Sequence, residues 1–303
     1  MPSTADRIDA RLTALLAPPA IALVDLIADG HRIGFLTPER AQRLERFDAF
    51  RRRGDGLEIA CNPAERNAVM ADVARTLATE GALTAWRDER YAVRTGFDAP
   101  PLFEIERAAA RYFGIRTFAV HVNGLVRTPE GIGMWVARRS ATKAIDPGML
   151  DNLVGGGIAA GATIADTVVK ESWEEAGIAA ATSAHAIPVA ELHVFRQQPD
   201  GIQHETIHAH DLWLAPDWTP ANQDGEAVEH RLMPIAHAAD VIARETGPDV
   251  MTADASLVAL DCLVRLGALE ARPAFARLAG GARTWTSPEK NTGGSAGPAS
   301  RPS

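Results

Sequence analysis

Apolar positions in the first third of the chain repeat mostly at helical spacing. Ile8, Leu12 and Leu15 lie on one predicted helical face over residues 1–17, and Pro18-Pro19 ends that helix. The same reasoning predicts the other elements of this part, which are helices over residues 39–47, 62–80 and 102–112 and a strand over residues 86–93. This mixture predicts a small α+β unit.

Beyond Gly114 the pattern changes to that of strands alternating with helices. Phe118–Val126 is rich in β-formers, with Asn123-Gly124 as a predicted hairpin turn. The other predicted elements are strands over residues 133–138, 187–195 and 206–214 and helices over residues 163–176, 235–244 and 253–266. This part of the chain therefore reads as an α/β domain.

These patterns divide the chain into three predicted parts. They are an N-terminal α+β extension domain over residues 1–114, an α/β domain over residues 115–279 and a tail over residues 280–303. The tail is rich in Gly, Ser, Pro and Thr, which bury little apolar surface, so we expect it to be disordered.

Charge and cysteine content restrict the classes of function. A net charge of −8 and a pI of about 5.6 argue against non-specific nucleic-acid binding, which needs a basic face. Cys61 and Cys262 are far apart and form no zinc motif, as is usual for a reducing cytoplasm. The sequence has neither a signal-peptide pattern nor an apolar run of about 18 residues, so we expect a cytoplasmic protein that does not contact a membrane.

A glycine-rich loop leads into a helix that has clear signals at both ends. The glycines at residues 155–157 allow the backbone to approach a ligand closely. Thr163 is the predicted N-cap, with Asp166 at the capping-box position. Gly177 is placed to end the helix in a left-handed turn.

The last turns of this helix crowd three carboxylates onto one face, since Glu171, Glu174 and Glu175 follow i, i+3, i+4 spacing. Each like-charge pair costs an isolated helix roughly 0.2–0.5 kcal/mol, and acidic residues near a helix C-terminus oppose its dipole. A solvated acidic face is the alternative, but Mg²⁺ would relieve the repulsion and prefers such oxygen ligands. We expect the opposite face, with Ala165 and Val169, to pack on a sheet.

The segment resembles the Nudix box, which is a Gly, five residues, a Glu, seven residues and then Arg-Glu-apolar-x-Glu-Glu-x-Gly-apolar. When Gly177 is aligned with the last Gly, the positions that match are Gly156, Glu171, Glu174, Glu175 and Ile178. The resemblance implies a C-terminal Nudix α/β/α sandwich with a mixed sheet. It also implies Mg²⁺ as cofactor, with Mn²⁺ as the alternative ion, and cleavage of a diphosphate bond in a small metabolite.

Three positions depart from the box. Ala162 stands where the first Glu is usual, Lys170 replaces Arg, and Ser172 replaces the apolar residue. Lys170 keeps the charge but lacks the planar fork with which Arg holds a carboxylate. These changes keep open a non-catalytic Nudix module that binds a ligand, although all three glutamates of the metal site are retained.

Other segments are similar to a Nudix subgroup that has an N-terminal extension domain and is related to the Nudix part of thiamine pyrophosphokinase fusion proteins. They are residues 86–93, 101–108, 121–125, 151–153 and 224–226. This resemblance implies activity on thiamine diphosphate analogues. The alternative within enzymes is a nucleotide-sugar or dinucleotide pyrophosphatase.

The resemblance also implies roles for individual residues. Glu171, Glu174 and Glu175 would bind the metal with help from the Gly156 carbonyl group. A carboxylate would take the proton of the attacking water, and the catalytic candidates are Glu174, Glu175 and Glu226, the last in a later loop. Glu229 is a second candidate in that loop, and an exposed acidic turn is the alternative.

Residues outside the box complete the list of candidates. Arg138, Arg139 and Lys143 precede the box and are candidate phosphate ligands, unless they form only a solvated strand end. Trp135 or Trp213 would stack on a substrate ring only if it is not a core residue. His208 and His210 share a strand face, but no third ligand for zinc is evident. The sequence leaves open whether the N-terminal domain shapes the pocket or mediates a homodimer.

Overall fold

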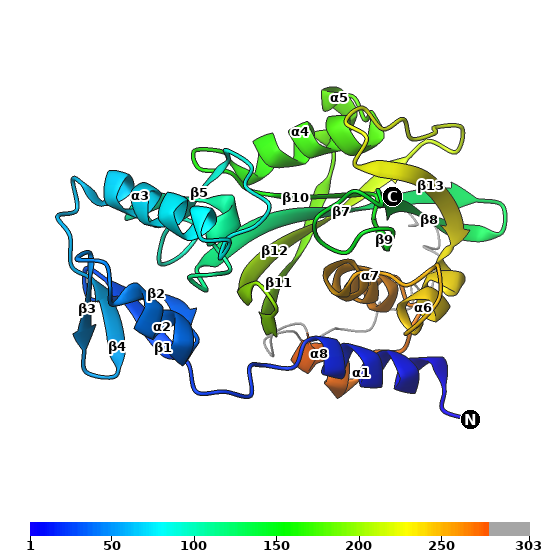
Figure 1. The fold of residues 1–303 in the computed structure, drawn as a ribbon. Coiled ribbons are helices and arrows are strands. Elements are labelled where there is room, and N and C mark those ends of the chain that lie inside the picture. The colour runs from blue at the N-terminus through cyan, green and yellow to red at the C-terminus, as the bar shows by residue number, and fades with distance from the viewer. Residues whose placement is uncertain (279–303) are drawn as a thin grey trace, which may run out of the picture.

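The computed structural model describes residues 1–278 and the side-chain surroundings up to residue 275. The tail predicted over residues 280–303 therefore lies outside the described residues. Among residues 1–278, no helix is both long and apolar enough to cross a membrane. The described chain forms two lobes around separate sheets, and the lobes join at Gly114 (Figure 1).

The N-terminal lobe is built on a four-stranded sheet in the order β2-β1-β4-β3 and a two-stranded sheet of β5 and β6. A core that runs from Leu26 to Ile115 holds these strands and two helices together. The elements are β1 (Val24–Ala28), β2 (His31–Leu36), α2 (Pro38–Leu44), β3 (Phe50–Arg53), β4 (Gly56–Ile59), α3 (Arg66–Thr79), β5 (Arg90–Val93) and β6 (Phe103–Glu106).

The helix predicted over residues 102–112 is wrong in this lobe. Residues 103–106 form β6, which pairs antiparallel with β5, and a short 3₁₀ helix, η1 (Arg107–Ala109), follows. Phe103 and Ile105 alternate into the core, and the Glu106 carboxylate accepts a hydrogen bond from the Ala108 N–H at the start of η1. Strand pairing thus outweighs the local helical preference of an Ala- and Arg-rich segment.

The C-terminal lobe is a sandwich around a seven-stranded mixed sheet. Its main path is β11-β12-β7-β8-β13, with β10 paired to β7 and β9 to β8. Figure 1 shows α4 and α5 above this sheet and α6 and α7 below it. The elements are β7 (Arg116–Thr128), β8 (Gly131–Arg139), β9 (Leu150–Asn152), β10 (Val154–Gly157), α4 (Ile164–Ala176), α5 (Ala180–Ser183), β11 (Ile187–Gln198), β12 (Gly201–Leu214), β13 (Ala227–Pro234), α6 (Ile235–Ile242), α7 (Ala253–Arg265) and α8 (Pro273–Leu278).

The hairpin turn predicted at Asn123-Gly124 is also wrong, because β7 runs straight through both residues. Asn123 is buried and donates a hydrogen bond to Asp211 in the neighbouring strand β12. Gly124 leaves room for the Leu153 side chain. The two residues therefore serve packing inside the sheet, and the chain turns only after Thr128.

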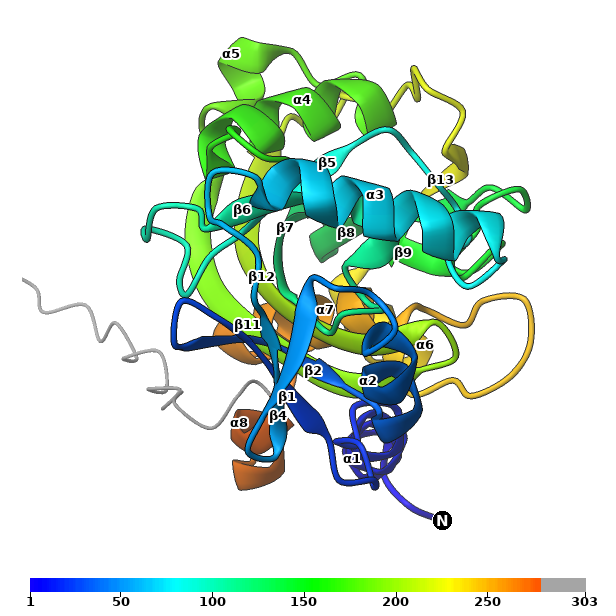
Figure 2. The same ribbon diagram turned by 60° about the vertical axis from the view of Figure 1, so that its left-hand side comes forward.

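The first helix belongs to the core of the C-terminal lobe. In α1 (Thr4–Leu15), Ile8 and Leu12 are fully buried in a cluster that includes residues of α6, α7 and α8. Figure 2 shows α1 below the four-stranded sheet, apart from α3. The N-terminal lobe is therefore formed by residues that follow α1. The predicted domain boundary at residue 114 stays a prediction.

Two glycines allow the lobes to meet at close range. A Cβ atom on Gly34 would overlap the Phe113 carbonyl oxygen, and one on Gly114 would overlap the Phe35 backbone. The Phe35 N–H donates to the Gly114 carbonyl group at 3.2 Å. Gly114 also has a φ of +57°, in the left-handed region. The backbone of β2 is thus fixed against the start of β7.

We expect Gly114→Ala to lower the free energy of unfolding by about 1–3 kcal/mol. The new methyl group would overlap the Phe35 backbone at the contact between the two lobes, which we call the seam, and an alanine is strained at this φ angle. Gly54→Ala is the matched control, since Gly54 has a φ of +58° but nothing within 4 Å of the place that its new methyl group would take. Urea unfolding of both variants measures the difference. Equal destabilisation would show that the close contact at the seam is unimportant.

Candidate active site

The helix that bears the glutamates begins and ends as its sequence predicts. The Thr163 hydroxyl accepts a hydrogen bond from the Asp166 N–H and the Asp166 carboxylate accepts one from the Thr163 N–H, forming a capping box. Gly177 ends α4 with a φ of +67°. A Cβ atom there would also crowd the Ala221 carbonyl group, so a glycine is needed both for the turn and for the adjacent loop.

The orientation of α4 differs from the prediction. Ala165 is exposed and Val169 only half-buried, whereas Val168, Ser172 and Glu175 are buried against the sheet. The buried face therefore includes one of the three glutamates. The prediction placed all three glutamates on the face away from the sheet and Ala176 on the packed face. Ala176 is buried as predicted, but Glu175 is buried too, since it has a hydrogen-bond donor on the sheet that makes its burial tolerable.

That donor is the backbone N–H of Gly155 in β10, which lies 2.8 Å from Glu175 Oε2. Burial is the main cause that raises the pKa of the Glu175 carboxyl to about 8, and the nearby charges of Asp151 and Glu171 add to the rise. The Gly155 N–H and Lys143 act in the opposite direction without cancelling it. The donors and cations around the Glu175 carboxylate thus do not offset the cost of burying its negative charge.

The other two glutamates lie nearer the surface and share one cation. Lys170 Nζ lies 3.0 Å from Glu171 Oε1 and 2.7 Å from Glu174 Oε2. The side chain of Glu171 is only 13% exposed, against 36% for Glu174. Burial raises the pKa of Glu171 despite its contact with Lys170. Glu171 packs directly on the Cα of Gly156, where any side chain would displace it.

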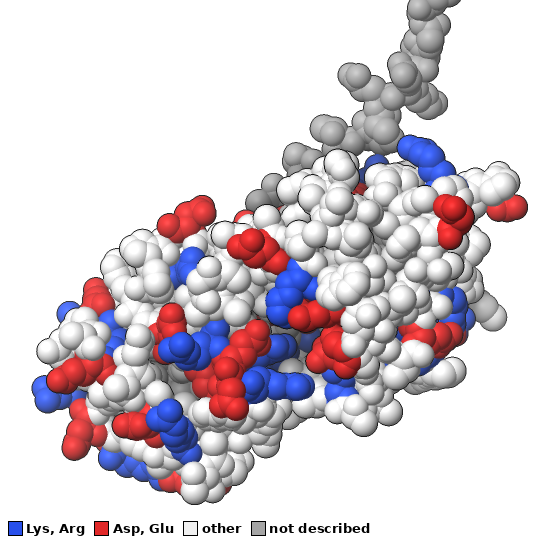
Figure 3. Space-filling model, turned by 90° about the horizontal axis from the view of Figure 1, so that it is seen from above, with Lys and Arg blue, Asp and Glu red and all other residues white. Residues whose placement is uncertain are grey.

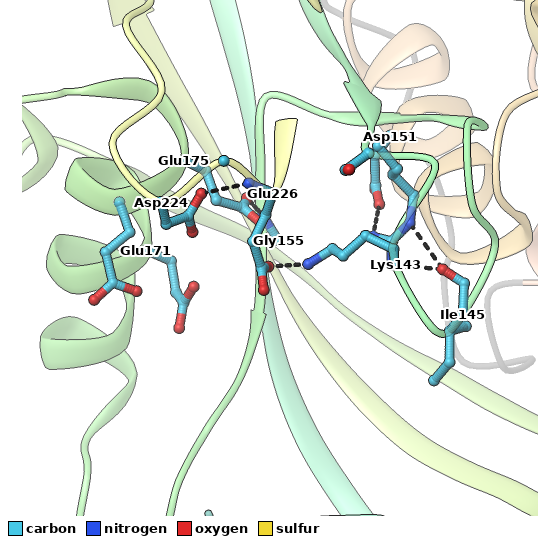
Figure 4. A network of polar contacts seen from close by, with 12 residues as sticks. Lys143, Ile145, Asp151, Gly155, Glu171, Glu175, Asp224 and Glu226 are labelled. Carbon is cyan, nitrogen blue, oxygen red and sulfur yellow. Dashed lines mark hydrogen bonds and ion pairs between the residues drawn. The ribbon is translucent and has the colours of Figure 1, made fainter. Parts of the chain in front are cut away.

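The loop between β12 and β13 brings Glu226 to this group. Its backbone is held by the C-terminal end of α4, since the Gln223 N–H donates to the Glu174 carbonyl group at 2.8 Å and the Ala221 N–H to that of Ala176 at 2.9 Å. These bonds satisfy helix carbonyl groups that would otherwise lack partners. The Glu226 carboxylate forms an ion pair with Lys143, which extends from the opposite side of the site (Figure 4).

A cleft of about 120 Å³ lies beside the glycine strand. The glycines at residues 155–157 form one wall, and Arg107, Arg111 and Arg139 are among its other lining residues. Arg139 is also held by Asp151 at 2.7 Å and Arg107 by Glu89 at 2.6 Å. Arg139 is one of the phosphate ligands predicted from the sequence. Arg107 and Arg111 were not predicted, because both fell on a predicted helix of the other domain and no sequence spacing links them to the box.

Several predicted residues do not reach the cleft. Arg138 points to the other face of β8, where its guanidinium contacts Glu229 at 2.7 Å and Asp249 at 2.6 Å. Arg138, Glu229 and Asp249 thus form an ion-pair network away from the three glutamates of α4. Trp135 packs edge-on against Trp218, and Trp213 packs with the core beneath Arg127, so neither lines the cleft.

The donor set suits a hard divalent cation. Glu171 and Glu175 supply buried carboxylates whose charges repel each other, and the Gly156 backbone lies against one of them. Carboxylate and carbonyl oxygens are the ligands that Mg²⁺ prefers. Among residues 1–278, no three acidic, His or Cys side chains already stand in metal-binding geometry. The exposed Lys170 side chain lies between Glu171 and Glu174 and contacts both.

Comparison with known families agrees with this geometry. Residues 117–253 match the model of the NUDIX domain. These residues contain β7 to β13, α4 and the glutamates. Residues 117–253 are thus similar to Nudix domains. The predicted fold, a Nudix sandwich of helices around a mixed sheet preceded by a smaller α+β domain, is confirmed. Residues 20–117 match a second model, described as a domain of unknown function, DUF4743.

Two relatives from one plant are similar to about two thirds of this chain. Nudix hydrolase 20, chloroplastic, from Arabidopsis thaliana is 38% identical over 68% of this chain, and Nudix hydrolase 24, chloroplastic, from the same plant is equally similar. The chain spans only about half the length of these relatives, 54% and 55%. The crystal structure of DR0079 from Deinococcus radiodurans is 25% identical, with a TM-score of 0.41, and covers 56% of this chain and 97% of that one.

The three departures from the Nudix box have different surroundings. Ala162 packs against the core, so no charged group takes the place of the usual Glu. Lys170 still contacts two glutamates. Ser172 is fully buried, and its hydroxyl has no hydrogen-bond partner among the described residues. A polar group without a partner among the described residues thus lies beneath the helix that bears the three glutamates.

Stability of the metal-free protein should depend on the charge of Glu175. Its pKa is about 8 in the folded protein against an ordinary 4.5, so the folded state holds this proton more tightly than the unfolded state does. The associated stability is therefore present below about pH 4.5 and is lost as the pH rises through about 8.

We expect the melting temperature of the metal-free wild type to fall more steeply between these pH values than that of Glu175→Gln, which keeps an acceptor for the Gly155 N–H. Calorimetry in the presence of a chelator measures both curves. Glu39→Gln, at an exposed site of α2, is the control and should follow the wild type. Parallel curves for wild type and Glu175→Gln would show that Glu175 does not titrate in this range.

Proposed function

We propose that the protein is a Mg²⁺-dependent hydrolase that cleaves the diphosphate bond of a small metabolite. The observation that supports this most directly is the juxtaposition of the under-compensated Glu171 and Glu175 with a cleft that three arginines line. A diphosphate is an anion that arginines bind through paired hydrogen bonds. The same anion shares a divalent cation with carboxylates.

The residues of the proposed site divide into three tasks. Glu171, Glu174 and Glu175, with the Gly156 carbonyl group, would hold the metal. When bound, the ion would neutralise diphosphate charge and activate water. Arg107, Arg111 and Arg139 would orient phosphate oxygens from the far side of the cleft, as their positions in its lining suggest. This assignment replaces Arg138 by two arginines from the segment after β6.

Two carboxyl groups are candidates for taking the proton of the attacking water. The raised pKa of Glu175 makes it a stronger base than an exposed carboxylate, but it is buried and accepts a bond from Gly155. Glu226 lies in the loop anchored to α4 and is neutralised by Lys143, which must release it first. Lys143 would then be free to contact a phosphate.

The substrate proposal is a thiamine diphosphate analogue, in keeping with the resemblance of residues 86–93, 101–108 and 224–226 to the subgroup described above. Residues 101–108 include Arg107, which lines the cleft, so this part of the resemblance touches the site itself. Sugar nucleotides and dinucleotides are the second candidates, because the arginines of the cleft would bind the diphosphate and not the group attached to it. We place the activity in the cytoplasm.

Glu174→Gln should lower kcat by two or more orders of magnitude with little change in melting temperature, because the Glu174 side chain is half-exposed and, among the described residues, its carboxylate pairs with Lys170 alone. The measurement is release of phosphate or monophosphate with saturating Mg²⁺, with Glu39→Gln as the control for loss of one surface charge. Full turnover by Glu174→Gln would overturn the metal assignment. A folded protein that binds diphosphates but hydrolyses none would instead identify a non-catalytic Nudix module.

A substrate screen decides among the chemical classes. Thiamine diphosphate, its oxidised analogues, ADP-ribose, dinucleotides and nucleoside triphosphates are incubated with the protein and Mg²⁺ or Mn²⁺. We expect the highest kcat/KM for an oxidised thiamine diphosphate, and Arg107→Gln should raise KM for it by tenfold or more because a phosphate ligand is lost. A clear preference for a dinucleotide would refute the thiamine proposal while preserving hydrolase activity.

A further inference from the structure

A second cavity lies at the seam between the two lobes, away from the glutamates. Its volume is about 370 Å³, within the range of small-molecule pockets. Three arginines from separate elements line it, Arg32 of β2, Arg94 after β5 and Arg116 at the start of β7. None of its lining residues is acidic. The cavity therefore collects positive charge without a matching carboxylate in its wall.

This cavity and the active-site cleft lie on opposite faces of one sheet. In the parallel pair of β7 and β12, Arg116 lies beside His204 and Thr117 beside Glu205. Neighbouring residues of a strand point to opposite faces. His204 and Arg116 line the seam cavity, whereas Glu205 lines the cleft. A ligand in the seam cavity would thus be separated from the active-site cleft by the sheet itself.

The arginines have few partners of their own. Arg116 Nε donates to His204 Nε2 at 3.1 Å, and no described residue binds its two terminal amino groups. Arg94 donates to the Phe97 carbonyl group, while its buried Nε has no partner among the described residues. Arg32 lies over the Phe35 ring, with its Cζ 4.8 Å from the centroid, and its ion pair with Asp25 is distant, at 3.8 Å between two largely exposed side chains. All three guanidinium groups thus keep donors free for an anion.

Aromatic rings form the apolar part of the cavity. Phe35 and Phe195 meet edge-to-face with centroids 4.9 Å apart, and His204 lies 5.4 Å from each. Burial lowers the pKa of His204 to about 4, so the ring is neutral at physiological pH. The rings give an uncharged, apolar surface beside the three cations. An aromatic ligand ring packs well on such a surface.

We propose that the seam cavity is a binding site for a phosphorylated aromatic small molecule. The phosphate would bind the guanidinium groups of Arg32, Arg94 and Arg116, and the ring would pack on Phe35 and Phe195. Arginine is suited to this role because its planar fork binds phosphate oxygens in pairs. The close contact of Gly34 and Gly114 keeps the two walls in register, so the site is preformed.

Calorimetric titration with phenyl phosphate in the presence of a chelator tests the site without any hydrolysis. We expect wild type to bind, and Arg32→Ala and Arg116→Gln each to bind at least tenfold more weakly. Arg51→Ala removes an exposed arginine from β3 in the same lobe and should bind as wild type does. Arg107→Gln, which changes the cleft only, should also bind normally.

Two kinds of binding result would contradict the proposed seam site. Absence of binding to wild type at millimolar phenyl phosphate, or undiminished affinity of Arg32→Ala and Arg116→Gln, would overturn the proposal. Weakened binding in Arg107→Gln alone would place the ligand in the cleft and also overturn it. Failure of the hydrolase assay would leave this test unaffected, because no metal or turnover is involved.

A second measurement covers the case in which Arg116→Gln disturbs folding through its bond to His204. Phenyl phosphate should slow amide hydrogen exchange of the wild type in residues 31–36 and 201–206, which border the seam cavity. Exchange in residues 154–157, which border the cleft, should not change. Protection of the cleft strand without protection of β2 would contradict the proposal.

Discussion

The site depends on the burial of a carboxylate, Glu175, between α4 and the glycine strand β10. An ionised carboxyl group inside a protein needs donors or cations around it, and here the structure offers one backbone N–H and a nearby lysine. Glu171 lies close by with the same charge and is also largely buried. The protein thus accepts an electrostatic cost at one edge of an otherwise conventional core, which a divalent cation would offset.

The surrounding elements serve to keep this arrangement in place. The glycines of β10 admit the glutamates because any side chain at Gly156 would overlap Glu171. The loop that bears Glu226 is tied to the last carbonyl groups of α4, so the helix end and the loop form one unit. Across the cleft, Arg107 and Arg111 come from the segment that leads out of the N-terminal lobe. The Nudix domain and the preceding domain therefore contribute jointly to one surface.

The path of the chain also links the two lobes. The helix α1 packs on α6 and α7, so the chain starts in the C-terminal lobe, crosses to the N-terminal lobe and returns through Gly114. Both polar sites follow from this path, because the cleft and the seam cavity each take residues from the two lobes. In the view from above, acidic and basic side chains are mixed over the N-terminal lobe, and the rest of this face carries fewer charged side chains (Figure 3).

The sequence by itself determined the elements whose signals are local. Thr163, Asp166 and Gly177 fixed both ends of α4, and the spacing of Glu171, Glu174 and Glu175 put them on one helix, because caps and helical periodicity act within a few residues. Only the tertiary structure decided which face of α4 is buried, that residues 103–106 pair as a strand, and that Asn123-Gly124 continues β7. Those outcomes depend on partners distant in the chain. Strand direction and the packing of the lobes set where a side chain points. For this reason Arg107 and Arg111 line the cleft, whereas Arg138 points to the other face of β8.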